Sequence, residues 1–333
     1  MASVSSKKII TVIGATGNQG GSVVGTFLQE PGWHIRGITR NTSSPKALAL
    51  AARGVEVVQA DMDEPPTLEP AFRDAAVIFA VSDFWGIYGE PTNKFKPKPG
   101  SLNVQAAERE ARQLMSVIDE AAKVPQLERF ILSSLSNPIK WSHGKYTQIV
   151  HFNSKVKAED HARSKYPDLW KKTSLFQAGY FLSNFVINPI TQPIRNEAGV
   201  LQFISNLDPN LKLPFIAPEE DSGPIVKALV QESAGKNIIG YREWLTLREI
   251  TQLFTEATGE SAEPVMLPRG ESNLPYPPDL KVQLDECWAY WNEFGYEARD
   301  DPTVIHPQDL DSPPRLDSVI NYFTKQDWSK TFT

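Results

Sequence analysis

Short apolar runs alternate with amphipathic stretches along the first 180 residues or so. Runs of β-branched and other apolar residues between turn residues predict strands, over residues 9–13, 33–39, 55–60, 76–81, 129–133 and 174–177. Apolar residues that recur every three or four positions predict helices, over residues 20–28, 45–53, 67–73, 104–122 and 152–164. Alternating strands and helices form a parallel sheet with right-handed crossovers. The pattern therefore predicts a Rossmann-type doubly wound α/β fold, with its ligand crevice at the carboxyl ends of the strands.

The alternation ends near residue 185. Prolines cluster in residues 264–278 and 302–314, and a helix is predicted between them over residues 282–296. Proline-rich loops around one or two helices suit a small cap over the crevice. We therefore expect a first domain over residues 1–185 and a smaller α/β cap region over residues 186–333, with segments of the two halves interleaved.

Composition narrows the class of protein. The chain has 333 residues, of which 41% are hydrophobic and 22% charged, as in ordinary soluble globular proteins. Its net charge of −6 argues against direct binding to nucleic acid or to an anionic membrane. The single cysteine, Cys287, excludes an intrachain disulfide and favours a reducing compartment. The N-terminal apolar run is too short for a signal peptide or a membrane span. We expect a cytoplasmic protein, with the nucleus as the alternative.

A glycine-rich turn follows the first predicted strand and opens the first predicted helix. Glycine permits a tight turn and a close approach of the backbone to a pyrophosphate. The helix N-terminus offers N–H groups and a partial positive charge to the phosphates. The strand–turn–helix context favours a dinucleotide site over a turn that binds nothing. The residues assigned to this site are Gly14, Thr16, Gly17, Asn18, Gln19 and Gly20.

The end of the second predicted strand bears on which dinucleotide the site prefers. Sites that prefer NAD carry an acidic residue there, which accepts a hydrogen bond from the ribose 2′-hydroxyl. This chain has Arg40 instead, between Thr39 and Asn41. A guanidinium group pairs with a 2′-phosphate and stacks on adenine. The sequence therefore favours NADP(H) and assigns it to the first domain, against the alternative that Arg40 is a solvated surface residue.

Further candidate cofactor residues follow the third and fourth predicted strands. Asp61 and Met62 flank the adenine in one interpretation, whereas in the other Asp61 caps a turn before two prolines. The nicotinamide half of the cofactor is expected after the fourth strand, beside Val81, Ser82 and Asp83. The aromatic side chains of residues 84–85 and 288–291 either wall this pocket or pack in the core.

Several segments, in order, resemble the NmrA-like family, an atypical branch of the short-chain dehydrogenase/reductase superfamily. The segments cover roughly residues 7–190 and read VIGATGNQGGSVV, IRGITRN, VEVVQADMDE, VSDFW, RFILSSL, HFNSK and AGYFLSNF. Some members of the family are reductases. Others bind NADP(H) and act as redox sensors that regulate transcription factors with little or no catalysis. Membership alone therefore does not choose between an enzyme and a sensor.

The resemblance places two residues of HFNSK at the centre of the site. Lys155 corresponds to the superfamily's lysine, which implies that its ammonium group binds the nicotinamide ribose and stabilises charge on a substrate oxygen. The alternative is an exposed lysine that pairs with Glu159 one turn further along the helix. His151 stands where the superfamily usually has a tyrosine. It is either the proton donor, since its ordinary pKa suits proton transfer near neutrality, or a structural hydrogen-bonding residue.

Four further residues complete the predicted active site. Ser133 matches the region that supplies the superfamily's serine, and it either orients a carbonyl or satisfies backbone groups at the strand end. Tyr180 is the candidate phenol for proton transfer. Tyr180, Phe181 and Asn184 are expected to border the nicotinamide, where the asparagine hydrogen-bonds the carboxamide.

Two functions follow from these residues. The first is an NADPH-dependent reductase that transfers a hydride to a carbonyl, imine or conjugated double bond of a small apolar molecule. The alternative is a non-catalytic NADP(H) sensor, in which the cofactor reorders loops around residues 84–100 and alters binding to a regulatory protein partner. The five histidines lack metal-ligand spacing, so no metal site is expected.

Overall fold

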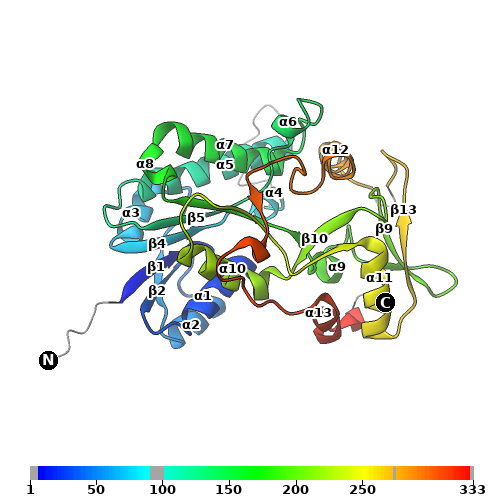
Figure 1. Cartoon of the computed structure of the whole chain (residues 1–333), viewed down its shortest axis with the longest axis horizontal. Helices are drawn as coiled ribbons and strands as arrows, with labels where there is room; N and C mark the ends of the chain where they lie inside the picture. The colour runs from blue at the N-terminus through cyan, green and yellow to red at the C-terminus, as the bar shows by residue number, and fades with distance from the viewer. Residues whose placement is uncertain (1–6, 91–100, 273–274, 331–333) are drawn as a thin grey trace.

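Eight parallel strands form the main sheet of the computed structural model, which describes residues 7–90, 101–272 and 275–330 (Figure 1). Across the sheet the strand order is β3, β2, β1, β4, β5, β6, β11 and β14. The bounds are β1 (Lys8–Val12), β2 (Trp33–Thr39), β3 (Glu56–Gln59), β4 (Ala75–Ala80), β5 (Arg129–Ser134), β6 (Thr173–Ala178), β11 (Asn237–Gly240) and β14 (Val304–Ile305). The order reverses between β1 and β4, which opens a crevice at the carboxyl ends of these strands. The predicted Rossmann-type fold is confirmed.

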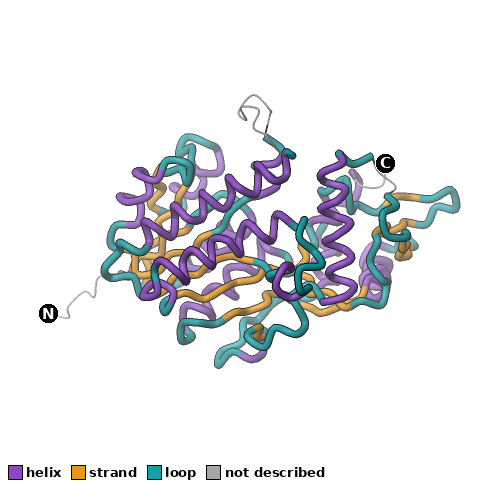
Figure 2. Tube along the Cα trace, turned by 90° about the horizontal axis from the view of Figure 1, so that it is seen from above, coloured by secondary structure: helices purple, strands orange, loops and turns teal. Residues whose placement is uncertain are grey.

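Helices cover both faces of the main sheet (Figure 1). On one face lie α1 (Asn18–Phe27), α2 (Pro45–Ala52) and α10 (Pro218–Gln231). On the other lie α3 (Leu68–Phe72), α5 (Leu102–Ala121) and α7 (Val150–Lys165), and the view from above shows helices running alongside one another over the strands (Figure 2). Because both faces are covered, β4 and β6 are buried along their whole length, as the unbroken apolar runs predicted.

The helices and strands predicted within the first 180 residues are present, with bounds shifted by at most two residues. The predicted helix of the second half is α12 (Pro278–Phe294), which begins four residues earlier than expected. Proline is tolerated in the first helical turn, where its missing N–H group would have no partner. Three short helices were not predicted, because one turn is too short for a periodic pattern. They are α4 (Phe84–Tyr88), α6 (Pro138–Trp141) and α8 (Pro167–Trp170).

The chain beyond β6 builds two small sheets and several helices, which gather at the end far from the N-terminus (Figure 1). One sheet contains β7 (Tyr180–Phe181), β10 (Lys212–Ile216) and β12 (Glu243–Thr246), and the other β8 (Ile194–Arg195), β9 (Leu201–Ser205) and β13 (Ala262–Met266). The helices are α9 (Asn184–Ile187), α11 (Leu247–Thr258), α12 and α13 (Val319–Lys325). Their aromatic side chains share one apolar cluster, in which Phe215, Phe254 and Phe323 are fully buried.

Two strands from this later part of the chain, β11 and β14, extend the main sheet beyond β6. The domain division near residue 185 stays a prediction. Within the described residues, no helix has the length and apolar character that crossing a bilayer requires.

The turn between β1 and α1 depends on two glycines. Gly14 has a φ of 67°, in the left-handed region that favours glycine. A Cβ atom at Gly20 would lie 2.2 Å from the carbonyl oxygen of Gly14, which is backbone and cannot swing away. The turn and the first turn of α1 are therefore in contact through bare backbone.

We predict opposite effects for alanine at two glycines of α1. Gly20→Ala should lower the free energy of unfolding by about 2 kcal/mol or more, because the clash strains the turn. Gly25→Ala, where a Cβ would meet no atom within 4 Å, should raise it by about 0.5–1 kcal/mol through helix propensity. Urea unfolding of both variants measures this. Equal effects at the two positions would contradict the close packing at Gly20.

Candidate active site

A cleft of about 650 Å³ lies at the carboxyl ends of β1 to β4. Four loops supply most of its lining, each following one strand, as expected for the ligand crevice of a doubly wound sheet. The cleft collects most of the predicted cofactor residues, namely Gly14, Thr16, Gly17, Asn18, Gln19, Gly20, Arg40, Asp61, Met62, Val81, Ser82, Asp83 and Phe181. The structure therefore brings together in space four sequence segments that the strand pattern had placed at one sheet edge.

The glycine turn closes on itself and leads into α1. The Gly17 N–H group donates to the Gly14 carbonyl oxygen at 2.9 Å. Gly17 is also the N-cap of α1, and among the described residues this position has no side-chain cap. The first N–H groups of a helix have no partner within the helix itself. The turn thus offers backbone donors and the positive end of a helix dipole to an anion.

The adenine end of the cleft carries both predicted polar residues. The Arg40 side chain is 67% exposed, and its Nη1 lies 3.7 Å from Oε1 of Glu90. Asp61 fills both of its proposed roles, because it lines the cleft and its Oδ1 also accepts a hydrogen bond from the Asp63 N–H group at 3.0 Å. Lys46 Nζ donates to the Thr16 carbonyl oxygen at 3.4 Å, which adds a positive charge beside the glycine turn.

Lys155 is held by a carboxylate that the sequence had not indicated. Its Nζ lies 2.8 Å from Oε1 of Glu110, which is completely buried. Glu110 also accepts hydrogen bonds from Ser154, beside Lys155 in α7, and from Ser82 Oγ at 2.7 Å. The alternative pairing of Lys155 with Glu159 is wrong, because the Glu159 carboxylate turns instead to Ser134 and Arg163. Since Ser82 lines the cleft, the buried ion pair is connected to the cofactor pocket through one hydroxyl.

His151 is a buried and neutral imidazole. Its Nδ1 accepts a hydrogen bond from Nε2 of Gln283 at 2.8 Å, and Oε1 of Gln283 accepts in turn from Nδ2 of Asn103 at 3.1 Å. This chain of amides places the ring proton on Nε2. Burial, together with the positive charge of Lys155, lowers the pKa of His151 to about 3. At neutral pH the ring can therefore donate a hydrogen bond through Nε2, but it carries no second proton.

The aromatic residues around His151 come from α4 and α7. The ring lies 5.6 Å from that of Phe84 and 5.2 Å from that of Trp85, measured between centroids. Phe84 is buried, whereas Trp85 is half-exposed. Of the aromatic residues in α12, Trp288, Tyr290 and Trp291 are buried in the core. The open alternatives for these side chains are therefore decided mainly in favour of packing.

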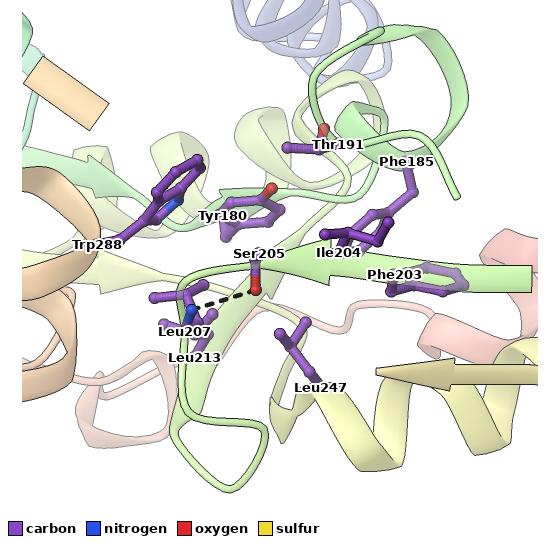
Figure 3. Close-up of a pocket in the computed structure, with 10 residues that line it drawn as sticks. All are labelled: Tyr180, Phe185, Thr191, Phe203, Ile204, Ser205, Leu207, Leu213, Leu247 and Trp288. Carbon is purple, nitrogen blue, oxygen red and sulfur yellow. Dashed lines mark hydrogen bonds between the residues drawn. The ribbon is translucent and has the colours of Figure 1, made fainter. Parts of the chain in front are cut away.

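Tyr180 and Phe181 point to different sides of the chain, as successive residues of a strand do. Phe181 lines the cofactor cleft. Tyr180 instead lines a separate apolar cavity of about 20 Å³, where its hydroxyl points toward Thr191 (Figure 3). Burial raises the pKa of Tyr180 to about 12, against the opposing hydrogen bonds of Thr191 and Asn184. The structure therefore keeps Tyr180 and its neighbour Asn184 away from the cleft.

Ser133 reaches the cofactor cleft indirectly. It is buried at the end of β5, and its Oγ donates to Oε1 of Gln19 at 2.9 Å. Gln19 lines the cleft beside the glycine turn. Ser133 is thus placed to orient the Gln19 amide rather than a backbone group at the strand end.

Glu110 and Gln283 were missed, although the sequence carries a signal for both. Glu110 lies three residues after Ala107 and four before Leu114, on the apolar stripe of a predicted helix. Gln283 lies on the buried stripe of α12 with Cys287. A polar residue on such a stripe needs a buried partner. The sequence shows the position, but it does not show which partner meets it.

We predict that Glu110→Gln lowers the free energy of unfolding by about 3–5 kcal/mol, because it leaves the Lys155 ammonium buried without a counter-charge. The double variant Glu110→Gln/Lys155→Met should recover most of this loss, since both charges are then removed together. Urea unfolding of the single and double variants measures the coupling. A single variant as stable as the unaltered chain would rule out the ion pair.

Glu159 gives the folded chain a specific pH dependence. Burial, opposed by the Ser134 hydrogen bond, raises the pKa of Glu159 from 4.5 to about 7. The folded chain therefore keeps a proton between pH 4.5 and 7 that the unfolded chain has released, so this contribution to stability is present below pH 4.5 and is lost as the pH rises through 7. Glu159→Gln removes the dependence. Its stability relative to the unaltered chain should rise by on the order of 3 kcal/mol between pH 4.5 and pH 8.

The matched control is the exposed neighbouring carboxylate, Asp160, whose side chain is 61% exposed. Asp160→Asn removes the same charge and should show little change with pH. Urea unfolding at both pH values compares the two variants. Identical pH dependence in both would mean that Glu159 titrates like an ordinary surface carboxylate.

Comparison with known proteins places this geometry in a family. Residues 6–323 match the NmrA-like family. The chain is 27% identical over 315 residues to the NmrA-like family domain-containing oxidoreductase hkm9 of Aspergillus hancockii, covering 90% of this chain and 81% of that protein. It is 28% identical over 278 residues to the oxidoreductase malD of Malbranchea aurantiaca, covering 78% and 76%.

Solved structures agree with the fold. NmrA, a negative transcriptional regulator solved in complex with NADP, superposes with a TM-score of 0.72 at 19% identity, covering 96% of this chain and 95% of that one. The triphenylmethane reductase of Citrobacter sp., complexed with NADP(H), superposes with a TM-score of 0.66 at 17% identity, covering 96% and 99%. Because the family match spans nearly the whole chain, this protein belongs to the NmrA-like family.

Proposed function

We propose that this chain is an NADP(H)-dependent reductase. The observation that carries the proposal is the cleft, where the glycine turn, Arg40 and the residues after β3 and β4 face one space. The names of the relatives support the same class of activity, since hkm9 and malD are described as oxidoreductases. The neighbouring reductase from Citrobacter sp. supports the choice of cofactor.

The residues of the cleft fit a dinucleotide that carries a 2′-phosphate. The Gly14 turn and the uncapped start of α1 suit the pyrophosphate. Arg40 is exposed enough to turn toward the 2′-phosphate, and Asp61 and Met62 lie where the adenine would rest. In this assignment the nicotinamide lies toward residues 81–83, at the end of the cleft where β4 finishes.

The chemistry requires a hydride, a site for developing negative charge and a proton. The bound, reduced nicotinamide supplies the hydride. Lys155, held through Glu110 and Ser82 at the edge of the cleft, stabilises negative charge on the substrate oxygen or nitrogen. His151 is neutral and donates at most a hydrogen bond. Because Tyr180 faces a different cavity, we assign the proton to water that enters the open cleft.

The substrate is in our proposal a small apolar carbonyl, imine or conjugated alkene. The nicotinamide end of the cleft supports this class, because Val81, Ile87 and Phe181 line it with apolar surface. We further propose a cytoplasmic location, for which the lone buried Cys287 is the support.

One observation favours the alternative of a non-catalytic NADP(H) sensor that acts through a regulatory protein partner. Each predicted proton donor is withdrawn, because His151 is sealed by Gln283 and Tyr180 lies in its own cavity. NmrA, a structural neighbour, is a negative transcriptional regulator. The loops assigned to the partner span residues 84–100, of which residues 91–100 lie outside the described part of the chain.

Turnover of NADPH distinguishes the two functions. The purified chain is mixed with NADPH and a panel of apolar aldehydes, ketones, cyclic imines and enones, and the loss of reduced nicotinamide is followed by absorbance. We expect turnover of at least one class. Lys155→Met should be tested in the Glu110→Gln background, where no buried charge is left unpaired, and should lower kcat by about 100-fold, on the scale of other losses of charge stabilisation.

A second variant tests the cofactor. Arg40→Ala should weaken NADPH binding by about tenfold or more while leaving NADH binding nearly unchanged, since only NADPH carries the 2′-phosphate. Fluorescence titration measures both dissociation constants. Tight NADPH binding without turnover of any substrate class would reject the reductase in favour of the sensor, and an unchanged NADPH/NADH ratio in Arg40→Ala would reject the role of Arg40.

A further inference from the structure

The guanidinium expected to bind the 2′-phosphate faces a carboxylate across the cleft. Arg40 follows β2, whereas Glu90 follows α4, and both line the cleft. Their side chains approach to 3.7 Å between Nη1 of Arg40 and Oε1 of Glu90. A solvent-accessible arginine at the 2′-phosphate position therefore has a competing anion within reach before any cofactor arrives.

Glu90 is held firmly, and Arg40 is not. Oε2 of Glu90 accepts a hydrogen bond from Nη1 of Arg109 at 2.7 Å. Arg109 also grips Asp63, through Nε at 2.9 Å and Nη2 at 2.6 Å, and Gln113 donates to the same Asp63 oxygen at 2.9 Å. The Glu90 side chain is only 14% exposed, against 67% for Arg40. A ligand can therefore move Arg40, whereas displacing Glu90 breaks the contact with Arg109.

The charges along this row alternate in sign. Arg40 and Arg109 are positive, Glu90 and Asp63 are negative, and the four formal charges sum to zero. A 2′-phosphate near Arg40 gains the attraction of one guanidinium, but it also meets the repulsion of a fixed carboxylate about 4 Å away, where the two interactions are of similar size. A free 2′-hydroxyl meets no such repulsion, and it can donate a hydrogen bond to a carboxylate.

We propose that Glu90 is a specificity-determining residue that limits the preference of this site for the 2′-phosphate. In NAD-preferring sites the carboxylate stands at the end of the second strand. Here an arginine occupies that position, and the carboxylate comes from the opposite side of the cleft. The site thus binds NADP(H) through Arg40 and also admits NAD(H) beside Glu90. This inference rests on the proposed function, because it concerns the selectivity of the same cleft.

The test is the ratio of dissociation constants for NADPH and NADH, measured by fluorescence titration. Glu90→Gln keeps the shape and the hydrogen bond to Arg109 but removes the charge. We expect it to tighten NADPH binding by about tenfold and to leave NADH binding equal or weaker, so that the preference for NADPH rises. Glu64→Gln is the matched control, because Glu64 is a nearby exposed carboxylate, and it should change the ratio by less than about twofold through solvent screening.

Glu90→Ala serves as a second variant and should shift the ratio in the same direction. Thermal unfolding of each variant checks that it is folded. An unchanged or lowered NADPH preference in both folded variants would overturn the inference, and so would an equal shift in Glu64→Gln. Such a result would leave the proposed function intact wherever the unaltered chain still binds and oxidises NADPH. Failure of the unaltered chain to bind either nucleotide would instead refute the proposed function itself.

Discussion

A carboxylate with no access to water organises the catalytic side of this molecule. Glu110 contributes one negative charge to the layer between α5 and α7, where an isolated charge would be very costly. The cost is offset because Lys155 supplies the counter-charge and two serines donate hydrogen bonds to the same carboxylate. Since Lys155 and Ser154 belong to α7 and Ser82 follows β4, the pair fixes the position of α7 relative to the cofactor cleft.

The same layer explains why His151 does not behave like a free histidine. Its ring sits within one helical turn of the Lys155 ammonium, and its Nδ1 is satisfied by an amide from α12. Both surroundings disfavour a second proton. The helix–strand framework of the first 180 residues and the later helix α12 therefore meet at this imidazole. The chemistry available at HFNSK depends on a residue more than 100 positions away in the chain.

The family resemblance places the chain among proteins of two kinds, and the fold does not separate them. What distinguishes an enzyme from a sensor on this scaffold is local: which proton donor faces the cleft, how a lysine is charged and what lines the nicotinamide end. Here the cofactor residues converge on one cleft, whereas Tyr180 and Asn184 gather in a second cavity. The cofactor assignment consequently stands on firmer geometric ground than any assignment of a proton donor.

Much of this architecture could be predicted from the sequence, because it depends on local patterns. Unbroken apolar runs indicated the buried parallel strands, and the glycine turn required a particular backbone at Gly14 and Gly20. Strand order then carried Arg40, Asp61 and Ser82 to one edge of the sheet. These inferences need only the periodicity of a strand or helix and the geometry of a parallel sheet.

The tertiary structure alone decided which partners the polar residues meet. Lys155 had a plausible partner one turn away in Glu159, but it pairs with Glu110 of another helix. The amide of Gln283 and the carboxylate of Glu90 likewise act across long sequence separations. Sequence periodicity shows which face of an element a side chain occupies, whereas its partner depends on how separate elements pack. That packing is set by the whole core, and so it is not encoded in any one segment.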